Sequence, residues 1–151
     1  MPSYIQPRVS DINSRSEVKT TKVIAYNGGE FECTPVVVSN MYNCGTIAMA
    51  KELNKFNIPV ALHKFYDVKT LQSLGNEFFE RNFYTMGFDY DKLKETGLNP
   101  KLICLDIANG YMTKFHDFVK QIKDEYPNSF IMAGNVCTAQ GANAIIAAGA
   151  D

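Results

Sequence analysis

Polar side chains with useful chemistry end four short apolar runs of this sequence. They are Ser39 and Asn40, His63 and Lys64, Asp106 with Asn109, and Gly134 with Asn135. If the runs are parallel strands, these groups gather at one edge of a sheet, where α/β folds bind their ligands. The alternative for any single residue is an ordinary polar turn after a strand, but four consecutive cases favour a site.

The residue types at these positions suit a nucleotide. Lys64 directly follows a buried run, where partial desolvation would let its ammonium donate a proton near neutral pH. The Asp106 carboxylate can accept two hydroxyl groups at once, as an acidic residue does for a ribose. Asn40 and Asn135 each offer a donor and an acceptor for the edge of a base. The sequence contains neither a Gly-x-Gly-x-x-Gly fingerprint nor a Walker A motif, which disfavours a Rossmann or P-loop phosphate cradle.

Composition narrows the class of protein further. With 15 basic and 16 acidic residues among 151, the net charge of −1 gives no general attraction to nucleic acid or anionic lipid. No apolar run approaches the ~20 residues of a membrane helix. The four cysteines form no Cys-x-x-Cys pair and no zinc-type cluster with histidine, so we expect no metal site, free thiols and a reducing, cytoplasmic setting.

The elements that would position these residues alternate regularly. Apolar runs begin near residues 35, 58, 83, 102 and 130, and each is followed by an amphipathic helical stretch, which predicts five βα units of roughly 20–28 residues. The clearest helix buries a stripe of Phe115, Phe118, Val119 and Ile122, and the last one carries Ala142, Ile145 and Ile146 on one face.

Residues 1–34 read as an irregular lead-in followed by a hairpin. The runs 23–26 and 30–34 flank Asn27-Gly28-Gly29, whose residue types supply the positive φ angles of a tight turn. We therefore expect a single domain over 1–151, with 1–34 as lead-in and hairpin and 35–151 as five βα units. Two architectures fit this pattern: an open doubly wound sheet, or part of a closed barrel, for which 151 residues fall short of the usual ~250.

Several of these segments together resemble the amino-terminal part of GMP reductase, in the IMP dehydrogenase/GMP reductase family. The matching segments, in order, are Ser14-Arg15-Ser-Glu-Val18, Pro35-Val-Val-Val-Ser-Asn-Met41, Gly45-Thr46, Leu62-His-Lys-Phe-Tyr66, Cys104-Leu-Asp-Ile-Ala-Asn-Gly-Tyr111, Ala133-Gly-Asn-Val136 and Ala148-Gly-Ala-Asp151. The resemblance covers nearly the whole chain, and the segment 104–111 is its most specific part. It implies an α/β fold that is a partial TIM (β/α)8 barrel.

The resemblance also implies an activity, the NADPH-dependent reductive deamination of GMP to IMP and ammonia. In this family a cysteine attacks the purine carbon that bears the amine, and hydride from the nicotinamide resolves the covalent intermediate. The positions that match dinucleotide contacts are Ser14, Arg15, Lys64, Asp106, Ile107 and Ala108. Lys64 is also the expected catalytic residue, protonating the departing ammonia, while Met41 and Asn135 match the purine pocket.

The sequence departs from the family in two places. Tyr42-Asn43-Cys44 replaces the usual Asp-Thr-Val, and the family's catalytic cysteine loop and phosphate-binding glycines have no counterpart here. Cys137 does not fall at the catalytic position. We therefore expect a chain that is inactive alone and that works with a complementary carboxy-terminal chain or forms a homo-oligomer.

Two alternatives remain open. The chain is a truncated, non-catalytic remnant that binds a nucleotide or self-associates, or it is a fragment of IMP dehydrogenase. The direct passage from the second apolar run into its helix favours the reductase, because the dehydrogenase usually carries a regulatory insertion there.

Overall fold

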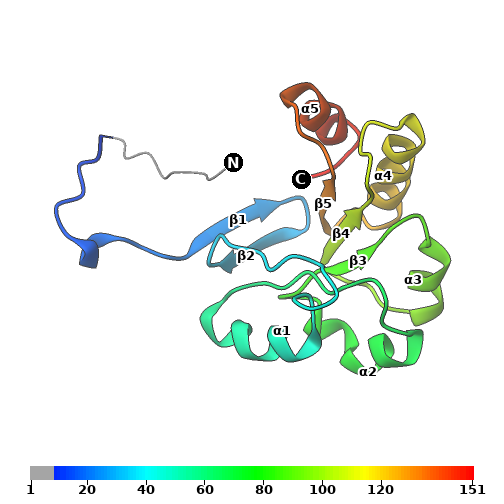
Figure 1. Cartoon of the computed structure of the whole chain (residues 1–151), viewed down its shortest axis with the longest axis horizontal. Coiled ribbons are helices and arrows are strands. Elements are labelled where there is room, and N and C mark those ends of the chain that lie inside the picture. Colours follow the sequence, from blue (N-terminus) through cyan, green and yellow to red (C-terminus); the bar gives the residue numbers. More distant parts are fainter. Residues whose placement is uncertain (1–8) are drawn as a thin grey trace.

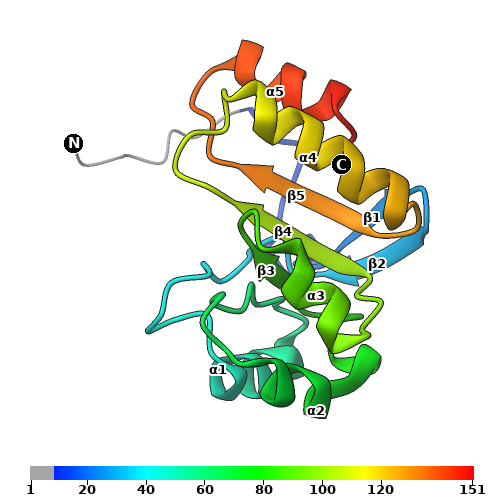
Figure 2. The same cartoon turned by 90° about the vertical axis from the view of Figure 1, so that its right-hand side faces the viewer.

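A computed structural model describes residues 9–151 of the chain. Its central element is a parallel sheet in which β4 (Leu102–Asp106) lies between β3 (Tyr84–Met86) and β5 (Phe130–Gly134) (Figure 2). The register pairs Thr85 with Cys104 and Asp106 with Gly134. The expected α/β class is therefore confirmed, and the start of the amino-terminal lead-in, residues 1–8, lies outside the described part.

The first two expected strands are shorter than their apolar patterns predict. Val38 pairs in parallel with Val60, and Ala61 with Phe83, each as a single residue pair. Pro59 lacks the N–H group that would extend the first pairing, and the Val60 N–H donates to the Asn82 side chain instead of extending the second. These pairs nevertheless extend the sheet, so neighbours follow one another in sequence order from residue 38 to residue 134.

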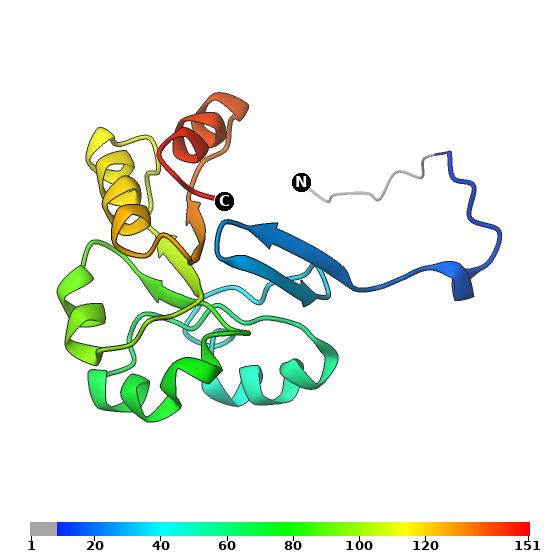
Figure 3. The same ribbon diagram turned by 180° about the vertical axis from the view of Figure 1, so that it is seen from behind.

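Within residues 9–151, five α-helices follow the strand segments and lie along an arc on one side of them (Figures 1 and 3). They are α1 (Ile47–Leu53), α2 (Val68–Phe78), α3 (Tyr90–Thr96), α4 (Thr113–Glu125) and α5 (Ala139–Ala147). Three begin at residues whose side chains accept a backbone N–H, namely Thr46, Asp67 and Thr138. Gly97, with φ of 65°, ends α3. None of the helices in residues 9–151 is long and apolar enough to cross a membrane.

The two faces of the sheet carry separate apolar clusters, because successive side chains of a strand alternate. Val60, Ile103, Leu105 and Ile131 face the helices, where the stripe of α4 is buried as predicted. The stripe expected on α5 is only partly buried: Ile145 is 2% exposed, whereas Ile146 is 58% exposed. Ile146 lies beside an open groove rather than against a neighbouring helix.

The predicted hairpin, β1 (Lys22–Tyr26) and β2 (Gly29–Cys33), packs on the face of the sheet opposite the helices (Figure 3). Phe31 meets Phe130 at a centroid distance of 5.4 Å, and Phe130 also contacts Tyr26 and Phe83 edge to face. The turn itself fits closely, because a Cβ on Gly28 would lie 1.9 Å from the Asn128 carbonyl oxygen. The hairpin therefore covers the amino-terminal half of this face and leaves the carboxyl-terminal half, around Cys104 and Asp106, to the candidate site.

Candidate functional site

The Asp106 carboxylate, at the carboxyl end of β4, joins three segments of the chain. Asn40 Nδ2 donates a hydrogen bond to Asp106 Oδ2 at 2.9 Å, and Asn135 Nδ2 donates to Asp106 Oδ1 at 3.0 Å. Asn135 Nδ2 also donates to the Ile107 carbonyl at 2.8 Å. We call Asn40, Asp106 and Asn135 the Asp106 site. A cavity of about 350 Å³ opens beside it, lined by the ends of the first, fourth and fifth strand segments.

The fold explains why these three side chains meet. Leu102, Cys104 and Asp106 are alternate residues of β4, so their side chains lie on the same face of the sheet, the face away from the helices. Its register partner is Gly134, which places Asn135 just beyond the same edge. Asn40 arrives from a segment 66 positions earlier, which enters the sheet at Val38. Three polar groups that the sequence placed after separate apolar runs thus share hydrogen bonds.

His63 and Lys64 lie at the end of the second strand segment, in a different environment. His63 is buried, and its Nδ1 accepts the Phe65 N–H at 3.3 Å. Burial lowers the pKa of His63, and the positive charge of Lys92 acts in the same direction, so the imidazole is neutral near pH 7. Lys64 is exposed, so the partial desolvation expected for its ammonium is wrong, because the chain turns away from the buried segment directly after His63. The Lys64 carbonyl accepts a hydrogen bond from Lys92 Nζ at 2.8 Å. Within residues 9–151 no hydrogen bond links Lys64 to the Asp106 site.

Some of the remaining predicted site residues lie near the Asp106 site, and others lie far from it. Ile107 and Ala108 continue directly from Asp106, and Met41, 63% exposed, follows Asn40 in a turn. Ser14 and Arg15 lie in an exposed segment that runs away from the sheet (Figure 1), where Ser14 caps the short 3-10 helix Arg15–Glu17. The structure does not bring Ser14 and Arg15 to Asp106.

One residue that positions the site had no role assigned from sequence. Tyr111 Oη accepts the Cys137 N–H at 2.9 Å and lies 3.0 Å from Thr138 Oγ1, so it ties the loop after β4 to the start of α5. Two glycines permit this approach. A Cβ on Gly110 would lie 2.6 Å from the Asn135 carbonyl oxygen, and one on Gly141 would lie 2.6 Å from the Tyr111 ring. The only sequence signal was that Tyr111 ends the motif 104–111.

Two of the four thiols are poorly suited to act as nucleophiles. Burial raises the pKa of Cys104 to about 12, and the negative charge of Asp106 acts in the same direction. Burial also raises the pKa of Cys33, the last residue of β2. Since the thiolate is the reactive form, these two cysteines serve packing rather than chemistry.

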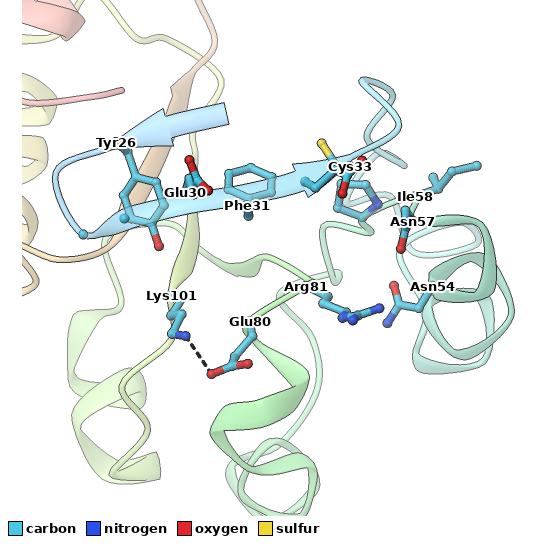
Figure 4. Close-up of a pocket in the computed structure, with 14 residues that line it drawn as sticks. Tyr26, Glu30, Phe31, Cys33, Asn54, Asn57, Ile58, Glu80, Arg81 and Lys101 are labelled. Carbon is cyan, nitrogen blue, oxygen red and sulfur yellow. Dashed lines mark ion pairs between the residues drawn. The ribbon is translucent and has the colours of Figure 1, made fainter. Parts of the chain in front are cut away.

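A larger cavity, of about 440 Å³, lies at the opposite ends of the strands, between the hairpin and the segments that precede the sheet (Figure 4). It contains none of the predicted site residues. Its charged lining is mixed, with Lys101 Nζ paired to Glu80 Oε1 at 2.8 Å on half-exposed side chains. In α/β barrel folds the amino-terminal ends of the strands contribute to stability, whereas ligands bind at the carboxyl-terminal ends. The Asp106 site, at the carboxyl-terminal ends, is therefore the better candidate.

The fold and the Asp106 site together define an α/β protein with a hydrogen-bonded polar cluster beside a cavity at the carboxyl ends of parallel strands. The model of the IMP dehydrogenase / GMP reductase domain matches residues 90–151. GMP reductase 2 from Bos taurus is 35% identical to 97% of the chain, and GMP reductase from Edwardsiella ictaluri is also 35% identical over 97%. The chain is therefore similar to proteins of the IMP dehydrogenase/GMP reductase family, over residues 90–151 by the family model and over 97% of its length by these relatives.

The match is partial on the relatives' side. The chain spans about half the length of these curated relatives, 45% of the bovine protein and 46% of the bacterial one. Among solved structures, the inosine 5′-monophosphate dehydrogenase of Legionella pneumophila superposes with a TM-score of 0.72 over 94% of this chain and 46% of the other. At 22% sequence identity, that likeness concerns the fold alone.

The contact between Gly141 and Tyr111 yields a test of how the site is held. We expect Gly141→Ala to displace the Tyr111 ring, break the Cys137 N–H to Tyr111 Oη bond, and lower the free energy of unfolding by about 1–3 kcal/mol. Chemical denaturation and the amide NMR shift of Cys137 measure the two effects. Gly87→Ala is the matched control, since its nearest contact would be an ordinary 3.8 Å to the Asp106 carbonyl oxygen. Equal stability and unchanged Cys137 shifts in both variants would contradict this role for Tyr111.

Proposed function

We propose that this chain supplies the nucleotide-binding wall of a site for NADPH-dependent reductive deamination of GMP to IMP and ammonia. The observation that carries the proposal is the Asp106 site, in a chain 35% identical over 97% of its length to proteins named GMP reductase. An IMP dehydrogenase fragment is the alternative within the same family.

The Asp106 site has room for ribose hydroxyls. A carboxylate offers about four lone-pair positions, and the two asparagine Nδ2 groups occupy one on each oxygen. The remaining positions can accept two hydroxyls while the asparagines fix the plane of the carboxylate. Asp106, Ile107 and Ala108 would thus hold the dinucleotide, whose bound nicotinamide supplies the hydride. Asn135 retains its Oδ1 as an acceptor for the purine, and Met41, exposed beside Asn40, would contact its face.

Lys64 is the proposed proton donor. Its exposed ammonium can reach a ligand without breaking an ion pair described in residues 9–151. The neutral His63 beside it adds no competing positive charge. A positioned ammonium can protonate ammonia as it leaves the purine, which is general acid catalysis. Ser14 and Arg15 would reach the dinucleotide only if their exposed segment, or the same segment of another copy, folded over the site.

We propose further that residues 1–151 form a single domain, and that this domain is part of a (β/α)8 barrel. Residues 35–151 would be its five βα units. Sequence-order neighbours in the sheet support this arrangement, because a doubly wound sheet reverses its strand order at a switch point. We propose that the nucleophile comes from a complementary polypeptide, as the resemblance implies. Cys33 and Cys104, which are buried with raised pKa values, are poor substitutes for it, and Cys137 does not fall at the family's catalytic position. All four cysteines are free, which supports a reducing, cytoplasmic setting.

Reconstitution tests the reaction. The chain mixed or co-expressed with a polypeptide that supplies the last three βα units of a GMP reductase should oxidise NADPH only when GMP is present, followed by absorbance at 340 nm. The chain alone should not. In the pair, Lys64→Met should lower turnover by about 10²–10⁴-fold, the usual contribution of a general acid. Lys69→Met, which removes a charge from α2, serves as the control. A reconstituted pair without GMP-dependent oxidation would overturn the proposed reaction.

The β5 edge supports a second proposal, that another polypeptide covers this side of the sheet. The Phe130 N–H and the Gly134 carbonyl form hydrogen bonds on the β4 side. Because backbone groups alternate along a strand, Ala133 directs its own to the opposite edge. An apolar groove of about 400 Å³ lies there, lined on its outer side by Ala142, Ile145 and Ile146. An open edge beside an apolar groove favours association. The occupant would be a second copy of this chain or the complementary polypeptide.

Sedimentation distinguishes the two occupants. If copies cover the groove, the isolated chain sediments as a dimer or larger, and Ile146→Glu shifts it to monomer by placing a charge in the groove. Ile12→Glu, at an equally exposed site in the amino-terminal segment, should leave the assembly intact. A wild-type chain that remains monomeric at all concentrations contradicts self-association.

A further inference from the structure

Four aromatic rings gather beside Lys64, at the ends of the first two strand segments. His63 stacks on Tyr66 with ring centroids 4.0 Å apart and an interplanar angle of 13°. Tyr42 lies 5.1 Å from His63 and 6.2 Å from Phe65, and Phe65 lies 6.0 Å from His63. We call Tyr42, His63, Phe65 and Tyr66 the aromatic platform. They line an open cleft of about 520 Å³, together with Asn43, Thr46 and Asp67.

The inner half of the platform is held in place by the backbone. Tyr66 Oη accepts the Ile47 N–H, at the first residue of α1, at 3.0 Å. The His63 N–H donates to the Gly45 carbonyl at 2.8 Å, and its Nδ1 accepts the Phe65 N–H. These bonds connect the loop after the first strand segment to the loop after the second. The stacked His63–Tyr66 pair is therefore a fixed base for the two outer rings.

The outer half is exposed. Tyr42 and Phe65 are each 67% exposed, although each lies next to other rings that could have buried it. Large aromatic side chains kept at a surface beside a cleft are typical of binding sites rather than of packing. The charged side chain in the lining of the cleft is Asp67, so the rings rather than a positive charge would supply the binding contact. Exposed flat rings beside a cleft complement a flat ligand ring, because every base offers a face that can stack on an aromatic side chain.

We propose that the aromatic platform is a stacking subsite for the heteroaromatic ring of a nucleotide, with Tyr42 and Phe65 as the rings that contact it. This inference rests on the proposed function for the class of ligand, and adds a contact that depends on Tyr42, where the family has a different residue. Asp106 then binds ribose hydroxyls while the platform binds a ring, so one nucleotide or two neighbouring ones would occupy the carboxyl-terminal edge of the sheet. The ring belongs to GMP or to NADPH, and the two are separated by titration.

Calorimetric titration of the full chain with GMP and, separately, with NADPH tests the subsite. Tyr42→Leu and Phe65→Leu keep an apolar side chain but remove the ring, and each should weaken one of the two ligands by about tenfold, a typical value for loss of one stacking contact. The ligand that weakens identifies the source of the ring. Tyr42→Phe keeps the ring and should bind within about twofold of the wild type. Phe56→Leu is the matched control, because Phe56 is 66% exposed but lies outside the platform.

Each outcome decides between the two proposals. If wild-type protein binds a nucleotide and both leucine variants bind GMP and NADPH equally well, the subsite is wrong and the proposed function stands. If ribose 5-phosphate, which has no base, weakens by the same factor as the nucleotide, the loss is not due to stacking and the subsite is again wrong. If the wild type binds neither GMP nor NADPH, both proposals fail. Thermal unfolding of each variant confirms that Tyr42→Leu and Phe65→Leu remain folded.

Discussion

The parallel register of β4 with its two neighbours decides which side chains meet in this protein. With Asp106 paired to Gly134, alternate side chains of each strand face the helices, and the side chains between them lie on the opposite face of the sheet. A shift of one residue would exchange the two sets and move Asp106 into the apolar layer under α4. The Asp106 site therefore depends on the same register that buries Leu105 and Ile131.

The face away from the helices is divided between stability and binding. At its amino-terminal end, the hairpin buries Phe31 against Phe130 and Phe83 through edge-to-face contacts. At its carboxyl-terminal end, Asn40 and Asn135 hold Asp106 through charge-assisted hydrogen bonds. Tyr111 then fixes the loop that carries Asn135 through its bond from the Cys137 N–H. Binding groups thus sit on loops whose positions are set by a packed scaffold.

Much of the fold was accessible from the sequence because its local signals agree with its tertiary contacts. The hairpin forms where Asn27-Gly28-Gly29 predicts it, with Tyr26 opposite Gly29, but of these three residues Gly29 alone adopts the expected positive φ, at 135°. The periodic stripe on α4 is buried as expected. The polar ends of the apolar runs predicted that Asn40, Asp106 and Asn135 would lie together, and their hydrogen bonds show that they do. Strand ends are informative because parallel strands share one edge.

Other features depended on contacts that a single sequence does not encode. The first two strands form only single pairs, because Pro59 has no N–H for the first pairing and the Val60 N–H is taken by the Asn82 side chain in the second. Ile146 follows the helical period but faces an open groove, since periodicity says nothing of what lies opposite. The aromatic platform joins Tyr42 to Phe65 across two loops, and Ser14 and Arg15 lie in an exposed segment away from Asp106.

We propose that the Asp106 carboxylate binds the ribose of a dinucleotide. Calorimetric titration of the chain with NADPH tests this role most directly. Asp106→Asn keeps the size of the side chain but removes its charge and half of its acceptor capacity. We expect the wild type to bind, and Asp106→Asn to bind about 10- to 100-fold more weakly, the effect of losing hydrogen bonds to a charged group. Asp117→Asn, an exposed carboxylate on α4, should bind like the wild type. Equal affinity of the wild type and Asp106→Asn for NADPH would contradict the account.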